Sequence, residues 1–134
     1  MSVFMDTFAF IASINKLDAA HTEVIEYLAT CPGPIITTEW VLLEFADAFS
    51  QRNSRIIAGK TIQRTRQDPK FLVVPYDEAI ANDGFKLYMS RPDKDWSLTD
   101  CISFCVMTSF GLTDALTADQ HFEQAGFRAI FKKF

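Results

Sequence analysis

The sequence predicts an α/β fold: a three-layer α/β/α sandwich with a mostly parallel central sheet, in one domain covering residues 1–134. Short apolar runs alternate along the chain with stretches of helical periodicity. These runs are continuous rather than interleaved with polar residues, which is typical of strands buried on both faces of a parallel sheet. No repeat or linker-like segment divides the chain, and 134 residues suffice for one core.

The first strand and two helices follow from the N-terminal third of the chain. Residues 2–5 form a short apolar run that ends at Asp6, and residues 8–14 have helical spacing. Asp18 is the expected N-cap of the next helix, because its side chain can accept a backbone N–H. The sequence Cys-Pro-Gly-Pro at 31–34 ends that helix, since proline cannot continue it.

The middle of the chain adds a second strand and two helices. Residues 35–36 predict a brief strand, after which Thr37 or Thr38 can cap a helix that extends to Phe49. A further helical stretch covers about 52–67, with its continuity uncertain at Gly59.

The remaining elements follow the same alternation. Asp-Pro at 68–69 precedes a buried strand at 71–74, and residues 77–89 predict a helix. Ser97 opens a strongly apolar helix with Gly111 at its C′ position. The chain then predicts a strand at 113–117, a short helical turn after Asp119, and a last strand at 127–131.

Composition narrows the classes of protein. The net charge of −4 argues against a generic nucleic-acid binder, unless a bound cation or a local basic patch reverses the charge at the site. The N-terminus lacks the pattern of a signal peptide, and no apolar run approaches the roughly 20 residues needed to cross a membrane. An odd number of cysteines (Cys31, Cys101 and Cys105) indicates reduced thiols and a cytoplasmic protein. Cys101 and Cys105 share a helix face, where we expect them to be buried apolar side chains rather than metal ligands.

Carboxylates recur where a parallel sheet would bring them together. Asp6 ends the first strand, and Asp119 follows the strand at 113–117. Sites in open α/β sheets form beyond the carboxyl ends of the strands. Asp100, in the first turn of its helix, can face the same rim, and Glu44 lies on a helix between apolar neighbours. The sequence therefore predicts that these four acids form one cluster.

Such a cluster requires a counter-charge. Three carboxylates within about 5 Å of one another repel by roughly 3 kcal/mol per pair at an effective dielectric of about 20. Three pairs give roughly 10 kcal/mol, comparable with the whole stability of a domain, about 5–15 kcal/mol. The cluster must take up protons or bind a cation, and Mg²⁺ and Mn²⁺ prefer oxygen ligands. Such an ion can activate a water for attack on phosphorus and stabilise charge on the leaving oxygen.

Each acid also has a structural alternative. Asp6 or Asp119 could cap the helix that follows it. Ser97 and Asp100 have the spacing of a capping box, and Glu44 alone could be a solvated helix residue. Taken singly, the residues leave both interpretations open.

Three stretches of the chain carry a recognisable pattern. They are Val-Phe-Met-Asp-Thr at 3–7, Thr-Thr-Glu-Trp-Val-Leu-Leu-Glu at 37–44, and Asp-Lys-Asp-Trp-Ser-Leu-Thr-Asp-Cys-Ile-Ser-Phe at 93–104 continuing to Leu-Thr-Ala-Asp-Gln-His-Phe-Glu-Gln-Ala-Gly-Phe at 116–127. In this order they resemble the PIN-domain family, especially the VapC-type toxins of bacterial toxin–antitoxin pairs. The resemblance spans essentially the whole chain.

The resemblance implies an endoribonuclease that depends on Mg²⁺ or Mn²⁺. Asp6, Glu44 and Asp100 would be the main metal ligands, and Asp119 would complete the set, directly or through water. Thr7 and Thr117 would steady neighbouring carboxylates by hydrogen bonds. The resemblance also implies a homodimer and a cognate antitoxin, for which the apolar helices near 37–67 are candidate surfaces.

Other residues near the motifs have less defined roles. Arg52, Arg55 and Arg66 would share a face of one continuous helix and could contact phosphates beside the site, or could form a solvated face. Asp93 and Asp95 are expected to be loop residues rather than ligands. His21 is expected to be structural; His121 is less certain, but the metal chemistry does not require it.

Three other functions remain open. A phosphoryl-accepting receiver domain would need adjacent acids after the first strand, whereas Asp6 is followed by Thr7. A non-catalytic RNA- or protein-binding module on the same fold is the main alternative, and the intact set of acids argues against it. A DNA-cleaving nuclease cannot be separated from an RNA-cleaving one, because no 2′-hydroxyl contact can be identified from the sequence.

Overall fold

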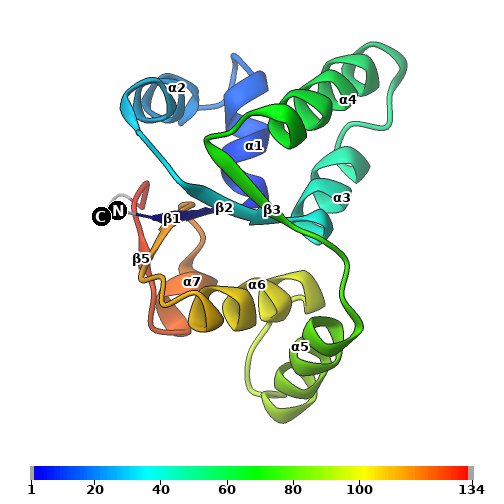
Figure 1. The fold of residues 1–134 in the computed structure, drawn as a ribbon, viewed down its shortest axis with the longest axis vertical. Helices are drawn as coiled ribbons and strands as arrows, with labels where there is room; N and C mark the ends of the chain where they lie inside the picture. The colour runs from blue at the N-terminus through cyan, green and yellow to red at the C-terminus, as the bar shows by residue number, and fades with distance from the viewer. Residues whose placement is uncertain (1, 133–134) are drawn as a thin grey trace.

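A computed structural model describes residues 2–132, and its centre is a parallel sheet of five strands in the order β3-β2-β1-β4-β5 (Figure 1). The strands are β1 (Val3–Met5), β2 (Ile35–Thr38), β3 (Phe71–Val74), β4 (Asp114–Leu116) and β5 (Arg128–Ala129). Every strand pairing is parallel, with Phe4 of β1 opposite both Ile36 of β2 and Ala115 of β4. The predicted parallel sheet is confirmed.

Helices cover both faces of this sheet, so the predicted three-layer sandwich is confirmed. They are α1 (Thr7–Ile14), α2 (His21–Thr30), α3 (Glu39–Asp47), α4 (Arg52–Gln67), α5 (Glu78–Ser90), α6 (Leu98–Ser109) and α7 (Gln120–Gln124). In Figure 1, α1, α2 and α4 lie above the sheet, α5, α6 and α7 lie below it, and α3 lies beside the end of β2. The core between the layers contains the fully buried Phe4, Phe10, Phe45 and Phe122.

The strand order reverses at β1, and this reversal creates the place for a site. The chain adds β2 and β3 on one side of β1 and then crosses to add β4 and β5 on the other. Loops leaving the carboxyl ends of β1 and β4 therefore diverge, and such a switch point leaves a crevice. Asp6 directly follows β1, and Asp119 lies three residues after the end of β4.

Three helix starts are capped as the sequence predicts. Thr38 accepts the N–H of Val41 at the start of α3. Ser97 and Asp100 form a reciprocal capping box on α6, and Asp119 accepts the N–H of His121 at the start of α7. Asp6 stands at the N-cap position of α1, but its side chain makes no capping hydrogen bond there. Its carboxylate is thereby available to the crevice.

The prediction for Asp18 was wrong. Helix α2 begins at His21 with Ala20 as its N-cap. The carboxylate of Asp18 accepts the N–H of Ala20 at 2.9 Å, and its carbonyl accepts the N–H of His21 at 3.0 Å. Aspartate often bonds the backbone two residues on, and here this produces a turn ahead of the helix instead of a cap.

The last strand is shorter than the predicted 127–131. β5 pairs with β4 only through Arg128 and Ala129. Beyond them, the N–H of Ile130 donates to Ala115 and that of Phe131 donates to Thr117, so the segment still follows β4. The apolar run predicted the direction of the segment but not where its regular pairing ends.

Two glycines in helices differ in their surroundings. α4 is continuous through Gly59, which resolves the doubt raised by its sequence, and a Cβ at Gly59 would meet no atom within 4 Å. Gly84 of α5 is buried against α6, where a Cβ would lie 2.4 Å from Ile102 Cγ1 and 3.0 Å from its Cα. Gly84 therefore permits the close contact of these two helices. Gly111 follows α6 with φ at +67°, as predicted for a C′ glycine.

The longest helix, α4, has 16 residues. Across residues 2–132, no helix combines the length and apolarity that crossing a membrane would require. All three cysteines are free, and Cys101 is fully buried on α6, in keeping with a packing role.

Candidate active site

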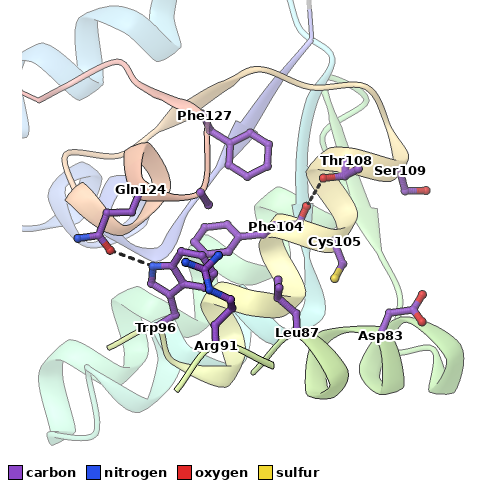
Figure 2. A pocket seen from close by; sticks show the side chains of 11 residues that line it. Asp83, Leu87, Arg91, Trp96, Phe104, Cys105, Thr108, Ser109, Gln124 and Phe127 are labelled. Atoms are coloured by element: carbon purple, nitrogen blue, oxygen red, sulfur yellow. Dashed lines mark hydrogen bonds between the residues drawn. The ribbon is translucent and has the colours of Figure 1, made fainter. Parts of the chain in front are cut away.

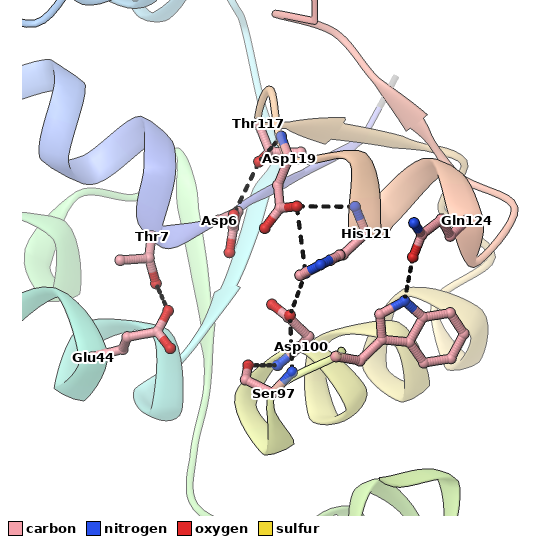
Figure 3. A network of polar contacts seen from close by, with 10 residues as sticks. Asp6, Thr7, Glu44, Ser97, Asp100, Thr117, Asp119, His121 and Gln124 are labelled. Atoms are coloured by element: carbon pink, nitrogen blue, oxygen red, sulfur yellow. Dashed lines mark hydrogen bonds and ion pairs between the residues drawn. The ribbon is translucent and has the colours of Figure 1, made fainter. Parts of the chain in front are cut away.

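The four predicted acids line one hollow at the carboxyl edge of the sheet. Its volume is about 480 Å³. Its lining residues are Asp6, Thr7, Phe8, Glu44, Asp95, Ser97, Asp100, Ala118, Asp119 and His121. The acids come from four segments separated in sequence: the chain just after β1 and β4, the middle of α3, and the first turn of α6 (Figure 3). The clustering predicted from their positions is therefore present in the fold.

Thr117 connects two of these acids. Its hydroxyl donates to Asp6 Oδ2 at 3.0 Å and accepts the backbone N–H of Asp119 at 3.1 Å. Both Asp6 and Thr117 are buried, so this bond lies away from solvent. One hydroxyl thus orients the Asp6 carboxylate and fixes the chain that carries Asp119.

Thr7 holds the third acid from the opposite side of the hollow. Its hydroxyl donates to Glu44 Oε1 at 2.5 Å. Glu44 lies in α3 beside the fully buried Phe45, so the helix is anchored while the carboxylate stays half-buried at the hollow. Thr7 and Thr117 thus make hydrogen bonds of the kind the family resemblance implies.

Asp100 is held through its helix start and through a histidine. Its backbone N–H donates to Ser97 Oγ, and its Oδ2 accepts the N–H of Ser97 at 3.1 Å. The same Oδ2 lies 3.2 Å from Nδ1 of His121, which is also 3.4 Å from Asp119 Oδ1. Capping and participation in the cluster are therefore compatible for Asp100, because one carboxylate oxygen does both.

The environment of the hollow favours protonated carboxyl groups. Burial raises the pKa of Asp6 to about 7, opposed by the Thr117 hydrogen bond and reinforced by Asp100 and Glu44. Burial also raises the pKa of Glu44 and of Asp100, to which neighbouring carboxylates add. Desolvation is thus the largest cause of these raised pKa values, and the mutual repulsion predicted from the sequence adds to it.

A divalent cation would relieve this penalty. Among the described residues that line the hollow there is no lysine or arginine, so no fixed cation neutralises the carboxylates. Asp100, Asp119 and His121 each offer a ligand atom, and the three atoms lie within 4.8 Å of one another. Asp6 and Glu44 line the same hollow but are not part of this close group. Carboxylate oxygens are the donors that Mg²⁺ and Mn²⁺ bind, so the residues present fit such an ion.

His121 lies closer to the acids than the sequence predicts. The metal chemistry expected from the sequence does not require a histidine, yet a ring nitrogen of His121 lies between two of the acids. Its position two residues after Asp119, within the turn capped by that acid, was the signal that could have identified it. Asp95, predicted to be a loop residue, is an exposed loop residue that also lines the hollow, whereas Asp93 forms an ion pair with Arg91 outside it.

The predicted phosphate-contacting arginines lie on α4, outside the hollow. Arg55 Nε donates to the carbonyl of Ser50 at 3.0 Å, and Arg66 forms an ion pair with Glu39. Arg52, at the first position of the helix, is exposed. Contact of these side chains with phosphate stays a prediction.

A second hollow lies between α5, α6 and α7 (Figure 2). Its volume is about 500 Å³, and its walls include Leu87, Phe104 and Phe127. Arg91 stacks over Trp96 at 5.0 Å from the ring centre, and the indole N–H donates to Gln124. This hollow is mainly apolar, and Asp83 is the one acid among its described lining residues, so it offers no cluster of carboxylates.

Comparison with known proteins identifies the fold. No protein-family model matches the sequence, and no curated protein matches it. Among solved structures, VapC20 of Mycobacterium tuberculosis, a sarcin–ricin loop cleaving toxin, superposes with a TM-score of 0.87 at 23% identity, over 96% of this chain and 98% of that one.

Two further structures agree with this match. FitAcB of Neisseria gonorrhoeae gives a TM-score of 0.69 at 16% identity, over 98% of this chain and 97% of that one. VapBC2 of Rickettsia felis, bound to a DNA fragment from its promoter, gives 0.68 at 13% identity, over 96% and 97%. The chain therefore has the PIN fold of the VapC-type toxins.

Proposed function

We propose that this protein is a Mg²⁺- or Mn²⁺-dependent endoribonuclease and acts as a VapC-like toxin. The observation that carries the proposal is the convergence of Asp6, Glu44, Asp100 and Asp119 in one hollow that contains no lysine or arginine among its described lining residues. The fold shared with VapC20, a toxin that cleaves the sarcin–ricin loop, supports RNA as the substrate class. Such a role places the protein in the cytoplasm, with its substrate.

The carboxylates would bind the ion, and hydrogen bonds from neighbouring residues would orient the carboxylates. Asp6, Glu44 and Asp100 are the main candidates for ligands, with Asp119 completing the set. When bound, the ion lowers the pKa of a water molecule and stabilises negative charge on the leaving oxygen of the phosphodiester. Thr117 and Thr7 fix the orientation of Asp6 and Glu44 before RNA arrives, which reduces the reorganisation needed for reaction.

Charge also governs how RNA would bind. Several carboxylates in one hollow repel a phosphate group of RNA. The cation is therefore needed for productive binding of RNA and not only for its cleavage. Arg52, Arg55 and Arg66 on α4 would contact phosphates farther along the strand. Replacing Arg52 with alanine would weaken RNA binding. It would also reduce the slope of log affinity against log salt concentration by the amount expected for about one phosphate contact.

The test of this function is cleavage of RNA by the purified full-length chain. Cleavage should require Mg²⁺ or Mn²⁺, stop on addition of a chelator, and vanish in Asp6→Asn. A single-stranded DNA of the same sequence, assayed in parallel, separates a ribonuclease from a deoxyribonuclease. RNA binding without turnover, unaffected by chelator, would instead support the non-catalytic module.

We also propose a cognate antitoxin and a homodimer. Leu43 on α3 and Ile56 and Ile57 on α4 are each about half exposed, at 51%, 55% and 51%, although they are apolar. These helices are the ones that the sequence suggested as an antitoxin surface. A small gene immediately upstream whose product co-purifies with this chain would support the pairing, and sedimentation of the isolated chain would determine whether it dimerises.

A further inference from the structure

The side chain of His121 lies against two acids of the carboxylate cluster, Asp100 and Asp119. Its Nδ1 lies 3.2 Å from Asp100 Oδ2 and 3.4 Å from Asp119 Oδ1, and Figure 3 shows the ring directed between the two acids. The carboxylates themselves belong to the function proposed above, on which this inference rests. We propose that His121 is a metal ligand and that its ring nitrogen makes the site prefer Mn²⁺ or a later transition-metal ion over Mg²⁺.

Two of the three separations between the donor atoms match those around a bound ion, and all three atoms lie within 4.8 Å of one another. Ligand bonds of about 2.0–2.2 Å at tetrahedral or octahedral angles place neighbouring donor atoms roughly 2.8–3.6 Å apart. The two distances from Nδ1 to the carboxylate oxygens fall within this range. An ion could therefore meet Asp100, Asp119 and His121 together with little movement of the protein.

The backbone holds His121 in this place. Its N–H donates to Asp119 Oδ1 at 2.9 Å, so the same carboxylate that faces the ring also caps the turn that carries it. The N–H of Asp119 donates in turn to Thr117 at 3.1 Å. The next residue, Phe122, is fully buried, so the start of α7 is anchored in the core. His121 is thus positioned by the fold rather than by the flexibility of an exposed side chain.

The chemistry of imidazole determines the preference. Mg²⁺ binds oxygen ligands almost exclusively and retains several waters. Imidazole nitrogen suits Mn²⁺ less than it suits Fe²⁺ or Zn²⁺, but it suits all of them better than Mg²⁺. A purely carboxylate site would lack this discrimination.

A competing role for His121 is to orient Asp100 by a hydrogen bond only. In that role the ring would not contact the ion, and its removal would weaken Mn²⁺ and Mg²⁺ binding by the same factor. Direct ligation instead predicts a nitrogen signature on the bound ion and a loss confined to ions that accept nitrogen. The two roles therefore differ in measurements that do not involve cleavage.

The experiment is pulsed electron paramagnetic resonance of Mn²⁺ bound to the full chain. We expect a ¹⁴N modulation from a coordinated ring in the wild-type protein and its loss in His121→Gln. His21→Gln is the matched control, because His21 is the other histidine of the chain and its Nδ1 lies 2.6 Å from the carbonyl of Ala12. The control should keep the full signal. Absence of the ¹⁴N signal in wild-type protein, or its survival in His121→Gln, would overturn the proposal.

Calorimetric titration provides the second measurement. His121→Gln should weaken Mn²⁺ binding by about tenfold or more while changing Mg²⁺ binding by less than about threefold. His121→Asp, which restores an oxygen donor, should bind both ions with a lower Mn²⁺-to-Mg²⁺ affinity ratio than wild type, and it serves if the glutamine variant does not fold. An unchanged ratio in whichever variants fold would contradict direct ligation.

RNA cleavage, assayed separately, distinguishes the failure of this inference from that of the proposed function. A nitrogen-coordinated ion with no cleavage of RNA or DNA would refute the nuclease and leave the metal site standing. Cleavage that is supported equally by both ions, without nitrogen coupling, would refute the role of His121 and leave the nuclease standing.

Discussion

The hydroxyl of Thr117 lies 3.0 Å from Asp6 Oδ2 and donates a hydrogen bond to it across 111 residues of sequence. This bond joins the carboxyl ends of β1 and β4, the two strands at which the sheet order reverses. Because the same hydroxyl accepts the N–H of Asp119, it sets the distance between the two acids. The relative position of Asp6 and Asp119 in the hollow therefore depends on this hydrogen bond.

Thr117→Val tests that dependence. Valine has the same shape but leaves buried Asp6 without its donor and the Asp119 N–H without its acceptor. We expect the free energy of unfolding to fall by about 1–3 kcal/mol and Mn²⁺ binding to weaken about tenfold. Thr108→Val is the matched control, since that hydroxyl donates to Phe104 within α6, away from the hollow. Identical metal affinity in Thr117→Val and the control would show that the bond does not organise the site.

Asp6→Asn should stabilise the protein when no divalent ion is present. Burial raises the pKa of the Asp6 carboxyl to about 7 in the folded protein, from an ordinary value of 3.8. Between these values the unfolded chain loses its proton while the folded chain keeps it, so stability falls as pH rises and the penalty is complete above pH 7. Removing the charge should raise the free energy of unfolding at pH 8 by about 1–3 kcal/mol and have little effect at pH 4. Denaturation with urea at both pH values, in the presence of chelator, measures this difference.

A different role for Asp6 predicts the opposite effect of Asp6→Asn on stability. If the carboxylate were an ordinary helix cap, its replacement would leave stability unchanged or lower it at pH 8. The same variant should lose cleavage of RNA, so stability and activity would move in opposite directions. Asp18→Asn, which alters a carboxylate in the turn before α2, should show neither effect.

Binding of the divalent ion should strengthen as pH rises. Burial raises the pKa of Glu44 and Asp100, and raises that of Asp6 to about 7, so a proton on Asp6 competes with the ion near neutral pH. The rise in melting temperature caused by Mn²⁺ should therefore be larger at pH 8 than at pH 6. A stabilisation that is independent of pH, measured by thermal denaturation with and without Mn²⁺, would mean that these carboxyl groups do not take up the ion.

Gly84 and Gly59 provide a paired test of the packing between α5 and α6. In Gly84→Ala the new methyl group would meet the backbone of Ile102, which cannot move as a side chain can, so we expect a loss of about 1–3 kcal/mol. Gly59→Ala meets nothing within 4 Å and should gain about 0.5–1 kcal/mol from helix propensity. Chemical denaturation gives both values, and a stabilising Gly84→Ala would contradict the close contact.

The order of the elements and the positions of most acids could be predicted because they depend on local patterns. Buried parallel strands are continuous apolar runs, and Asp6 and Asp119 follow two of them. The helix starts at Thr38, Ser97 and Asp119 could be predicted without tertiary information, because these residue types are common N-caps and the spacing of their neighbours is typical of a helix start. The PIN resemblance rested on these same segments, and the shared fold confirms it at the level of architecture.

Other features could not be predicted, because they depend on contacts between distant segments. The turn at Asp18 replaces a cap, and the pairing of β5 ends after two residues; neither has a local signal. His121 looked dispensable because a single sequence does not show that α7 directs its ring toward Asp100 on α6. The dominance of burial over repulsion in raising the pKa of Asp6 likewise requires the packed structure.

The central claim is that the clustered carboxylates form a metal-dependent site for RNA cleavage. The measurement that tests this is the single-turnover rate of RNA cleavage at saturating Mn²⁺ for Asp100→Asn and for Asp93→Asn, an exposed aspartate in the loop before α6 that pairs with Arg91. We expect Asp100→Asn to lose about 100-fold or more in rate, while Asp93→Asn stays within about twofold of wild type. Equal rates for the two variants would contradict it.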